Sequence, residues 1–141
     1  MRRTEQRRAA VWALYQSDLL GRPLEETFPH GAHEFTRQLA QLVRTHQPEL
    51  DELIREHATG WSLERIAPLE RSILRVALAE LLYPDRVPGM HAIPAEGAID
   101  EAVETAKRFC GADAPGFING ILAAVLRERE NDAAGKRATS L

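Results

Sequence analysis

The chain has 141 residues, of which 44% are hydrophobic and 28% are charged, and its formal net charge is −3. A chain of this length forms one domain with a buried core, and its composition excludes the low-hydrophobicity, high-charge regime of disordered proteins. Its single cysteine, Cys110, excludes an intramolecular disulfide and a cysteine-based zinc cluster. The N-terminus lacks the apolar run of a secretory signal, and no stretch has the roughly 20 apolar residues of a membrane span, so we expect a cytoplasmic protein.

Positive charge is concentrated in a basic arm that runs into the first predicted helix. Four arginines lie in the first eight residues: Arg2, Arg3, Arg7 and Arg8. An apolar 3-4 pattern predicts a helix that is capped by Thr4 and stopped by Gly21. Arg8 and Tyr15, seven residues apart, lie almost in line on this helix. Arginine contacts phosphate and an aromatic ring stacks on an unpaired base, although a solvated helix start and a half-buried tyrosine also fit the pattern.

The next segment predicts a loop and two helices. Residues 23–31 contain two prolines and a glycine, which is typical of a loop. The 3-4 pattern then resumes at Phe35 and predicts a helix that ends before Pro48. A shorter helix is expected over residues 50–58, with Gly60 as its C-terminal cap.

The second half predicts a short helix, an apolar helix and two further amphipathic helices. Ser62 caps the short helix, and Pro68 fits the first turn of a helix that continues to Leu81 and is expected to be central. A loop containing Pro84, Pro88 and Gly89 follows.

The last two predicted helices are separated by a glycine-containing turn. The first opens at Ile93-Pro94, carries apolar residues through Phe109 and ends at Gly111. The second covers residues 117–126, and the polar, aperiodic residues 131–141 predict a disordered tail.

No segment alternates apolar and polar residues as a strand does, so the predicted fold class is all-α. We expect a compact bundle of six or seven helices in a single domain over residues 1–130. Its two helical halves are about 1–60 and 61–130, and we find no internal repeat.

The sequence carries few signs of catalysis, and an enzyme is not expected. There is no Gly-rich phosphate loop, no G-x-S-x-G elbow and no H-E-x-x-H pair. His30 and His33 lack the further ligands of a zinc site and are interpreted as surface residues. Cys110 is interpreted as a small apolar residue at a helix end rather than as a nucleophile. No cofactor or metal is predicted.

Three segments, in this order and spacing, together resemble the NusB family over about residues 5–127. They are Arg7-Arg8-Ala9 with Ala13-Leu14-Tyr15 and Asp18; Leu69-Glu70-Arg71-Ser72-Ile73-Leu74-Arg75-Val76-Ala77 with Glu80-Leu81; and Ile93-Pro94 through Phe117-Ile118-Asn119-Gly120-Ile121-Leu122. The resemblance implies an all-α fold of two helical halves, in agreement with the periodicity.

The resemblance also implies a function and its residues. NusB-family proteins bind boxA-type single-stranded RNA together with NusE, a small-subunit ribosomal protein, in the RNA polymerase antitermination complex that transcribes ribosomal RNA operons. The resemblance assigns phosphate contacts to Arg3, Arg7 and Arg8, base stacking to Tyr15 and base-edge contacts to Glu70. It places a second RNA-facing edge at Phe109, Asp113, Phe117 and Asn119. From the pattern alone, Phe109 and Phe117 fit core packing equally well, and Asn119 fits a local backbone contact.

Two alternatives belong to other classes. One is a homo-oligomeric helical protein whose RNA face is occluded, and the sequence leaves monomer and homodimer both open. Apolar residues such as Trp12, Trp61 and Leu82 fit a dimer contact, a NusE contact or the core. The other is an accessory domain of an RNA methyltransferase, but the chain has neither the several hundred further residues nor the Gly-rich nucleotide-binding turn of a catalytic domain.

Overall fold

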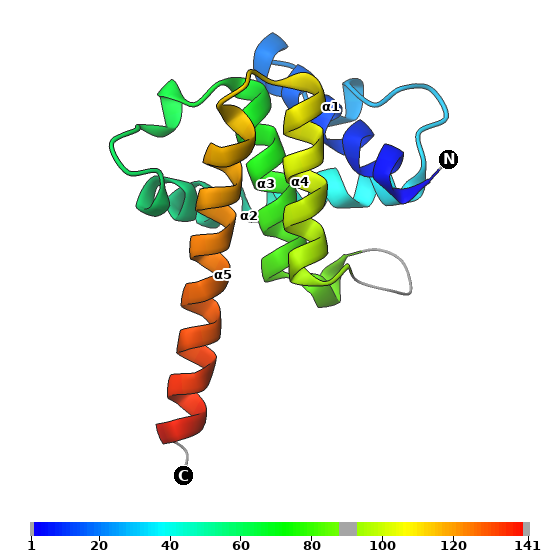
Figure 1. Ribbon diagram of the computed structural model, residues 1–141. Coiled ribbons are helices and arrows are strands. Elements are labelled where there is room, and N and C mark those ends of the chain that lie inside the picture. The colour runs from blue at the N-terminus through cyan, green and yellow to red at the C-terminus, as the bar shows by residue number, and fades with distance from the viewer. Residues whose placement is uncertain (1, 88–92, 140–141) are drawn as a thin grey trace.

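In the computed structural model, residues 2–87 and 93–139 are described, and every regular element among them is helical (Figure 1). The five α-helices are α1 (Arg3–Leu20), α2 (Glu34–His57), α3 (Pro68–Leu82), α4 (Ala95–Phe109) and α5 (Ala114–Thr139). Three short 3-10 helices connect them: η1 (Leu24–Glu26), η2 (Leu63–Arg65) and η3 (Pro84–Arg86). The predicted all-α fold is confirmed for the described part of the chain. The expected loop residues Pro88 and Gly89 lie outside it.

Helix α3 is the centre of the bundle, as its apolar sequence predicts. It packs against α1, α2, α4 and α5, and its residues 72–81 are all buried. Pro68 stands in its first turn, where a missing backbone N–H costs nothing. The buried apolar side chains form one cluster that draws on all five α-helices, with Leu14, Leu39, Leu78 and Leu122 among its fully buried members.

Helix α2 is a single helix through Pro48, and the predicted break there is wrong. Leu39, Val43, Leu50 and Ile54 are fully buried at helical spacing, while Pro48 is exposed. A proline inside a helix costs about 3 kcal/mol. Breaking the helix would withdraw Leu50 and Ile54 from the core, and each such side chain contributes about 1.5–3 kcal/mol. Continuous burial therefore outweighs the local cost.

Two predicted helix starts also differ from the structure. The N-cap of α1 is Arg2 rather than Thr4, because the Thr4 hydroxyl donates instead to Glu101 of α4 at 2.8 Å. The short helix after Ser62 is the three-residue 3-10 helix η2, without a side-chain cap. With α2 unbroken, these differences reduce the expected six or seven helices to five α-helices among the described residues.

Helix α5 begins three residues earlier than predicted and continues to Thr139, where the sequence predicts a disordered tail from residue 131. Residues 127–135 are all exposed, and Figure 1 draws this part of α5 extending away from the other helices. Good helix formers and the lack of a proline after Pro115 allow the helix to continue without a buried face. Glu128 accepts a hydrogen bond from His57 Nε2 at 2.9 Å, which links the segment to α2.

A buried ion network joins α1, α2 and α3. Arg75, only 4% exposed, donates from Nε and Nη2 to both oxygens of Asp51, at 2.8 and 3.1 Å. Its Nη1 donates to Asp18 at 2.8 Å, and the other oxygen of Asp18 accepts from Arg44 at 2.9 Å. The network therefore ties α1 and α2 to the central helix α3.

Candidate RNA interface

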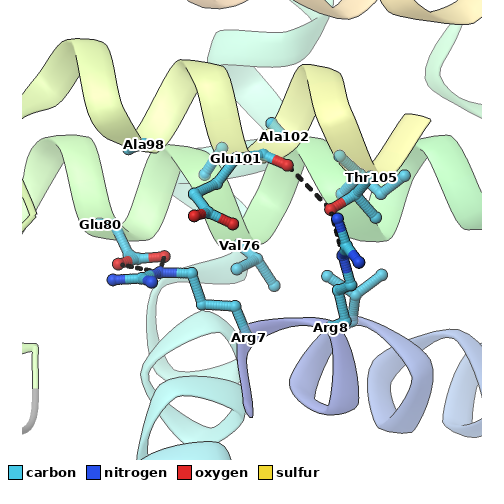
Figure 2. Close-up of a pocket in the computed structure, with 11 residues that line it drawn as sticks. Arg7, Arg8, Val76, Glu80, Ala98, Glu101, Ala102 and Thr105 are labelled. Atoms are coloured by element: carbon cyan, nitrogen blue, oxygen red, sulfur yellow. Dashed lines mark hydrogen bonds and ion pairs between the residues drawn. The ribbon is translucent and has the colours of Figure 1, made fainter. Parts of the chain in front are cut away.

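The three arginines at the start of α1 contact, between them, α2, α3 and α4. The guanidinium of Arg3 lies over the ring of Phe35 in α2, 4.2 Å from its centroid. Arg7 points to Glu80 of α3, and Arg8 points to α4 (Figure 2). The guanidinium of Arg7 also lies 5.5 Å from the centroid of Phe35, so Arg3 and Arg7 share this ring while Arg8 lies apart from it.

Arg7 is held by an internal carboxylate. Its Nε lies 2.9 and 3.0 Å from the two oxygens of Glu80, and the two side chains are 11% and 2% exposed (Figure 2). Burial raises the pKa of Glu80 above its ordinary value; the charge of Arg7 opposes this rise, and the charge of Glu101 adds to it. The pair links α1 to α3, so much of the Arg7 charge is neutralised inside the protein.

Arg8 belongs to a partly exposed surface of arginines and aromatic rings. We define the arginine–aromatic surface as Arg8, Trp12, Tyr15, Arg108 and Phe109. The Trp12 ring contacts Tyr15 and Phe109 edge to face, with centroids 5.6 and 5.3 Å apart. The guanidinium carbons of Arg8 and Arg108 lie 5.9 and 5.6 Å from the centroid of Phe109, which is 39% exposed. Cations and accessible ring faces side by side suit a phosphate backbone with unpaired bases.

The orientation of Arg8 is set by α4. Its Nε donates to the Thr105 hydroxyl at 3.3 Å, and Thr105 in turn donates to the backbone oxygen of Glu101 at 2.8 Å (Figure 2). This hydroxyl is neutral and a weaker partner than a carboxylate. It fixes the direction of the Arg8 side chain without compensating its positive charge. Arg7 and Arg8 are adjacent in sequence. Of the two, only Arg8 lies beside a ring of the arginine–aromatic surface, whereas Arg7 lies 5.5 Å from the centroid of Phe35 in α2.

Glu70, Asp113 and Phe117 meet at a second place, where α3 and α5 begin. Together with Trp61 and Arg65 they line an open cavity of about 230 Å³, which we name the Trp61 pocket. Phe117 is half-buried and packs against the core while it lines the pocket. Partial burial raises the pKa of Glu70. Three of the residues that the sequence predicts as contacts therefore share one cavity.

Asn119 is separated from these residues. Two positions along a helix turn the side chain by about 200°, so Asn119 leaves α5 on the side opposite to Phe117. It is exposed and lines a different hollow with Asp100 of α4 and Arg127 of α5. The structure does not bring Asn119 to the Trp61 pocket.

Sequence reasoning did not assign four residues of these two surfaces to RNA, although it named Trp12 and Trp61 as residues that fit a dimer contact, a NusE contact or the core. Trp12 lies four residues after Arg8 and three before Tyr15, a spacing that places all three on one helix face and was a usable signal. Arg108 adjoins Phe109, which itself was predicted. Trp61 and Arg65 carry no comparable local signal, because only the fold brings η2 against the start of α5.

The arrangement gives little support to a catalytic reading. Burial and the charge of Glu70 raise the pKa of the Cys110 thiol, which disfavours the thiolate that a nucleophile requires. Glu80 and Glu101 line a cavity of only about 20 Å³, room for a water molecule rather than a substrate. His30 and His33 are exposed, and within residues 2–87 and 93–139 no three His, Cys, Asp or Glu side chains are grouped as metal ligands. None of the helices described there is long and apolar enough to cross a membrane.

Comparisons with known proteins identify the family. The model of the NusB family matches residues 4–127. The transcription antitermination protein NusB of Halalkalibacterium halodurans is 41% identical over 86% of this chain and 91% of that protein, and its Bacillus subtilis counterpart is 36% identical over 92% and 98%. Among solved structures, T. maritima NusB has a TM-score of 0.77 at 32% identity, covering 91% of this chain and 92% of that one. A crystal structure of the antitermination factors NusB and NusE in complex with dsRNA has a TM-score of 0.74 at 26% identity, covering 91% and 99%. The chain belongs to the NusB family.

Proposed function

We propose that the protein is a cytoplasmic, non-catalytic RNA-binding adaptor that binds boxA-type single-stranded RNA together with NusE and supports transcription of ribosomal RNA operons as part of the antitermination complex. Family membership supports this function, since the relatives compared above are transcription antitermination proteins and one is solved with NusE and dsRNA. The single observation that carries the RNA contact is the arginine–aromatic surface, in which Arg8 and Arg108 both lie beside the exposed ring of Phe109.

The predicted contact residues divide into three groups under this proposal. Arg8, Tyr15 and Phe109 contact RNA from the arginine–aromatic surface, and Arg3, which is exposed beside Phe35, adds a separate phosphate contact. Glu70, Asp113 and Phe117 contact RNA from the Trp61 pocket. Arg7 acts as a positioning residue that holds α1 on α3, and Asn119 lies away from the RNA path.

The two RNA-contacting groups lie on neighbouring elements, and Cys110 marks where they meet. It follows Phe109 directly at the end of α4, and Asp113 of the Trp61 pocket follows four residues after Phe109, across the turn between α4 and α5. One strand can therefore cross from the arginine–aromatic surface to the pocket. Each stacked base contributes about 1–3 kcal/mol, so a few such contacts give modest affinity alone, which NusE binding increases.

A homodimer that occludes RNA remains the second candidate. Its supporting observation is a pair of exposed leucines at the end of α1, Leu19 and Leu20, which are 58% and 60% exposed. Exposed apolar residues of this size favour a contact with another molecule. Mass measurement in solution, with and without RNA, distinguishes the two. RNA dissociates a dimer that occludes the RNA face, whereas the mass of a monomer increases by the mass of the RNA.

Fluorescence anisotropy of a labelled boxA-type RNA tests the proposal. The protein is titrated with and without NusE at two salt concentrations, and Arg8→Ala is compared with Arg55→Ala. Arg55 is the matched control because it is an exposed arginine of α2 whose partner is Glu52, one turn away at 3.5 Å. We expect salt-sensitive binding that NusE strengthens, that Arg8→Ala weakens and that Arg55→Ala leaves unchanged. No binding in the presence of NusE would contradict the adaptor function.

A further inference from the structure

The Trp61 pocket contains two residues that neither the resemblance nor the proposed function assigns. Trp61 lies between α2 and η2, and Arg65 is the last residue of η2. Both face the same cavity of about 230 Å³ as Glu70 of α3 and Phe117 of α5. Three separate segments of the chain therefore contribute to one concave site, and its chemistry can be judged group by group.

The aromatic side of the pocket offers a stacking face. Trp61 is 54% exposed, and its ring contacts Phe117 edge to face with centroids 6.5 Å apart. The two ring planes meet at 65°, so Phe117 is not stacked face to face on the indole. An exposed indole face beside a cavity is the arrangement that unpaired bases use in single-stranded nucleic-acid sites.

The polar side of the pocket selects the edge of the base. Glu70 and Asp113 present carboxylate oxygens, which accept hydrogen bonds and repel acceptors. Guanine, cytosine and adenine each carry an exocyclic amino group that donates to a carboxylate. Uracil has carbonyl oxygens and no amino group, and its N3–H is the single donor on that edge, so it offers a carboxylate fewer hydrogens than the amino-bearing bases. Arg65 supplies the positive charge that a backbone phosphate requires at the mouth of the pocket.

We propose that the Trp61 pocket binds one unpaired base that carries an amino group, with Trp61 stacking on the base, Glu70 accepting its amino hydrogens and Arg65 contacting the adjoining phosphate. The proposal rests on the proposed RNA-binding function and adds two contact residues and a base preference to it. Trp61 and Arg65 lie outside the arginine–aromatic surface, so their contribution is separable from that of Arg8.

The test combines base deletion in the RNA with substitution of Trp61. A set of boxA-type RNAs, each with one abasic position, is titrated against the wild-type protein, Trp61→Ala and Trp61→Phe. Arg55→Ala is again the control because Arg55 is an exposed residue of α2 whose partner is Glu52, one turn away. Circular dichroism melting confirms that each variant is folded, which is expected because Trp61 is mostly outside the core.

For the wild type, we expect one abasic position to weaken binding by about 5- to 150-fold, the change given by one stacked base. Trp61→Ala weakens binding of the intact RNA by a similar factor, and the abasic change at that position then has no further effect. Trp61→Phe keeps most of the affinity, and Arg55→Ala behaves as the wild type. The proposed base site is contradicted if Trp61→Ala binds the intact RNA as tightly as the wild type does and the same abasic positions weaken binding of both proteins.

A second arm tests the base preference at that position. The base there is replaced in turn by guanine, cytosine, adenine and uracil, and uracil is expected to bind most weakly. Glu70→Gln adds an amide donor and should reduce the discrimination against uracil. Uracil binding as tightly as the amino-bearing bases would contradict the role of Glu70. If Arg8→Ala weakens RNA binding and Trp61→Ala does not, only the pocket proposal fails; if the wild type does not bind RNA, the proposed function fails with it.

Discussion

Two regions of the molecule use arginine and acidic or aromatic partners for opposite purposes. In the interior, Arg75 is 4% exposed and donates to carboxylates from two other helices. These ion pairs hold α1, α2 and α3 together. On the arginine–aromatic surface, Arg8 and Arg108 lie beside the ring of Phe109. Burial and the type of partner, rather than the residue type, separate a structural arginine from one that is available to phosphate.

Arg7 shows that a structural arginine and an arginine available to phosphate can be adjacent in the sequence. It precedes Arg8 directly, but it resembles the structural Arg75, because both carboxylate oxygens of the buried Glu80 accept from it. The neighbouring guanidinium is held by a neutral hydroxyl. One step of about 100° around α1 thus separates the two roles.

Arg75→Met gives the largest expected effect on stability. The substitution leaves Asp18 and Asp51 without their shared cation, and breaking a buried ion pair in this way costs about 3–5 kcal/mol. Urea unfolding followed by circular dichroism measures the loss. The RNA affinity of the folded fraction is expected to stay unchanged. A loss below about 1 kcal/mol would show that the network does not hold the three helices.

Arg7→Met is expected to separate the two adjacent arginines. It leaves Glu80, which is 2% exposed, without its cation, so the loss of unfolding free energy lies toward the lower end of the same roughly 3–5 kcal/mol range. Because Arg7 contacts little RNA under our proposal, the slope of log affinity against log salt stays the same. Arg8→Ala is the control, with little change in stability and a slope reduced by about 0.7 for one lost contact to a single strand. The reverse pattern would place Arg7 on the RNA.

Phe109→Leu is expected to reduce RNA affinity by about 1–3 kcal/mol through loss of a stacked base. Leucine keeps an apolar side chain against Trp12, so the unfolding free energy should change by less than about 1.5 kcal/mol. Anisotropy titration at two salt concentrations measures both the affinity and the salt slope, and the slope should not change because no phosphate contact is removed. Equal affinity of variant and wild type would assign Phe109 to packing alone.

The helices that sequence periodicity predicts well are those whose burial pattern is local. The centre of the bundle at α3 and the general course of α1 and α4 follow from apolar spacing within each segment. Pro48 misled the prediction because the local cost of proline is visible in the sequence, while the burial of Leu50 and Ile54 that offsets it depends on the other helices. Thr4 misled it likewise, since its hydroxyl donates to a residue 97 positions away.

The candidate site follows the same division. The alignment of Arg8 and Tyr15 is a property of one helix and was predictable. The partner that removes Arg7 from the surface lies 73 positions away, so only the fold distinguishes Arg7 from Arg8. The separation of Asn119 from Phe117 follows from helix geometry, but the cavity that Phe117 shares with Trp61 requires the packing of η2 against α5.

The smallest expected effect is a pH dependence carried by Glu80, which tests the interior side of the comparison. Burial raises the pKa of this carboxyl in the folded state, so the folded protein binds its proton more tightly than the unfolded chain does. The contribution of Glu80 to stability is therefore greatest below the ordinary carboxyl pKa and falls as pH rises through the raised value.

Glu80→Gln removes this titration, so the unfolding free energy of the wild type minus that of the variant should decrease from acidic to neutral pH. Urea titrations of both proteins across that interval measure the difference, and the paired comparison cancels the other carboxyls. A difference that instead grows toward neutral pH would mean that the charge of Arg7 outweighs burial and that the pair stabilises α1 on α3 more strongly as the carboxylate forms.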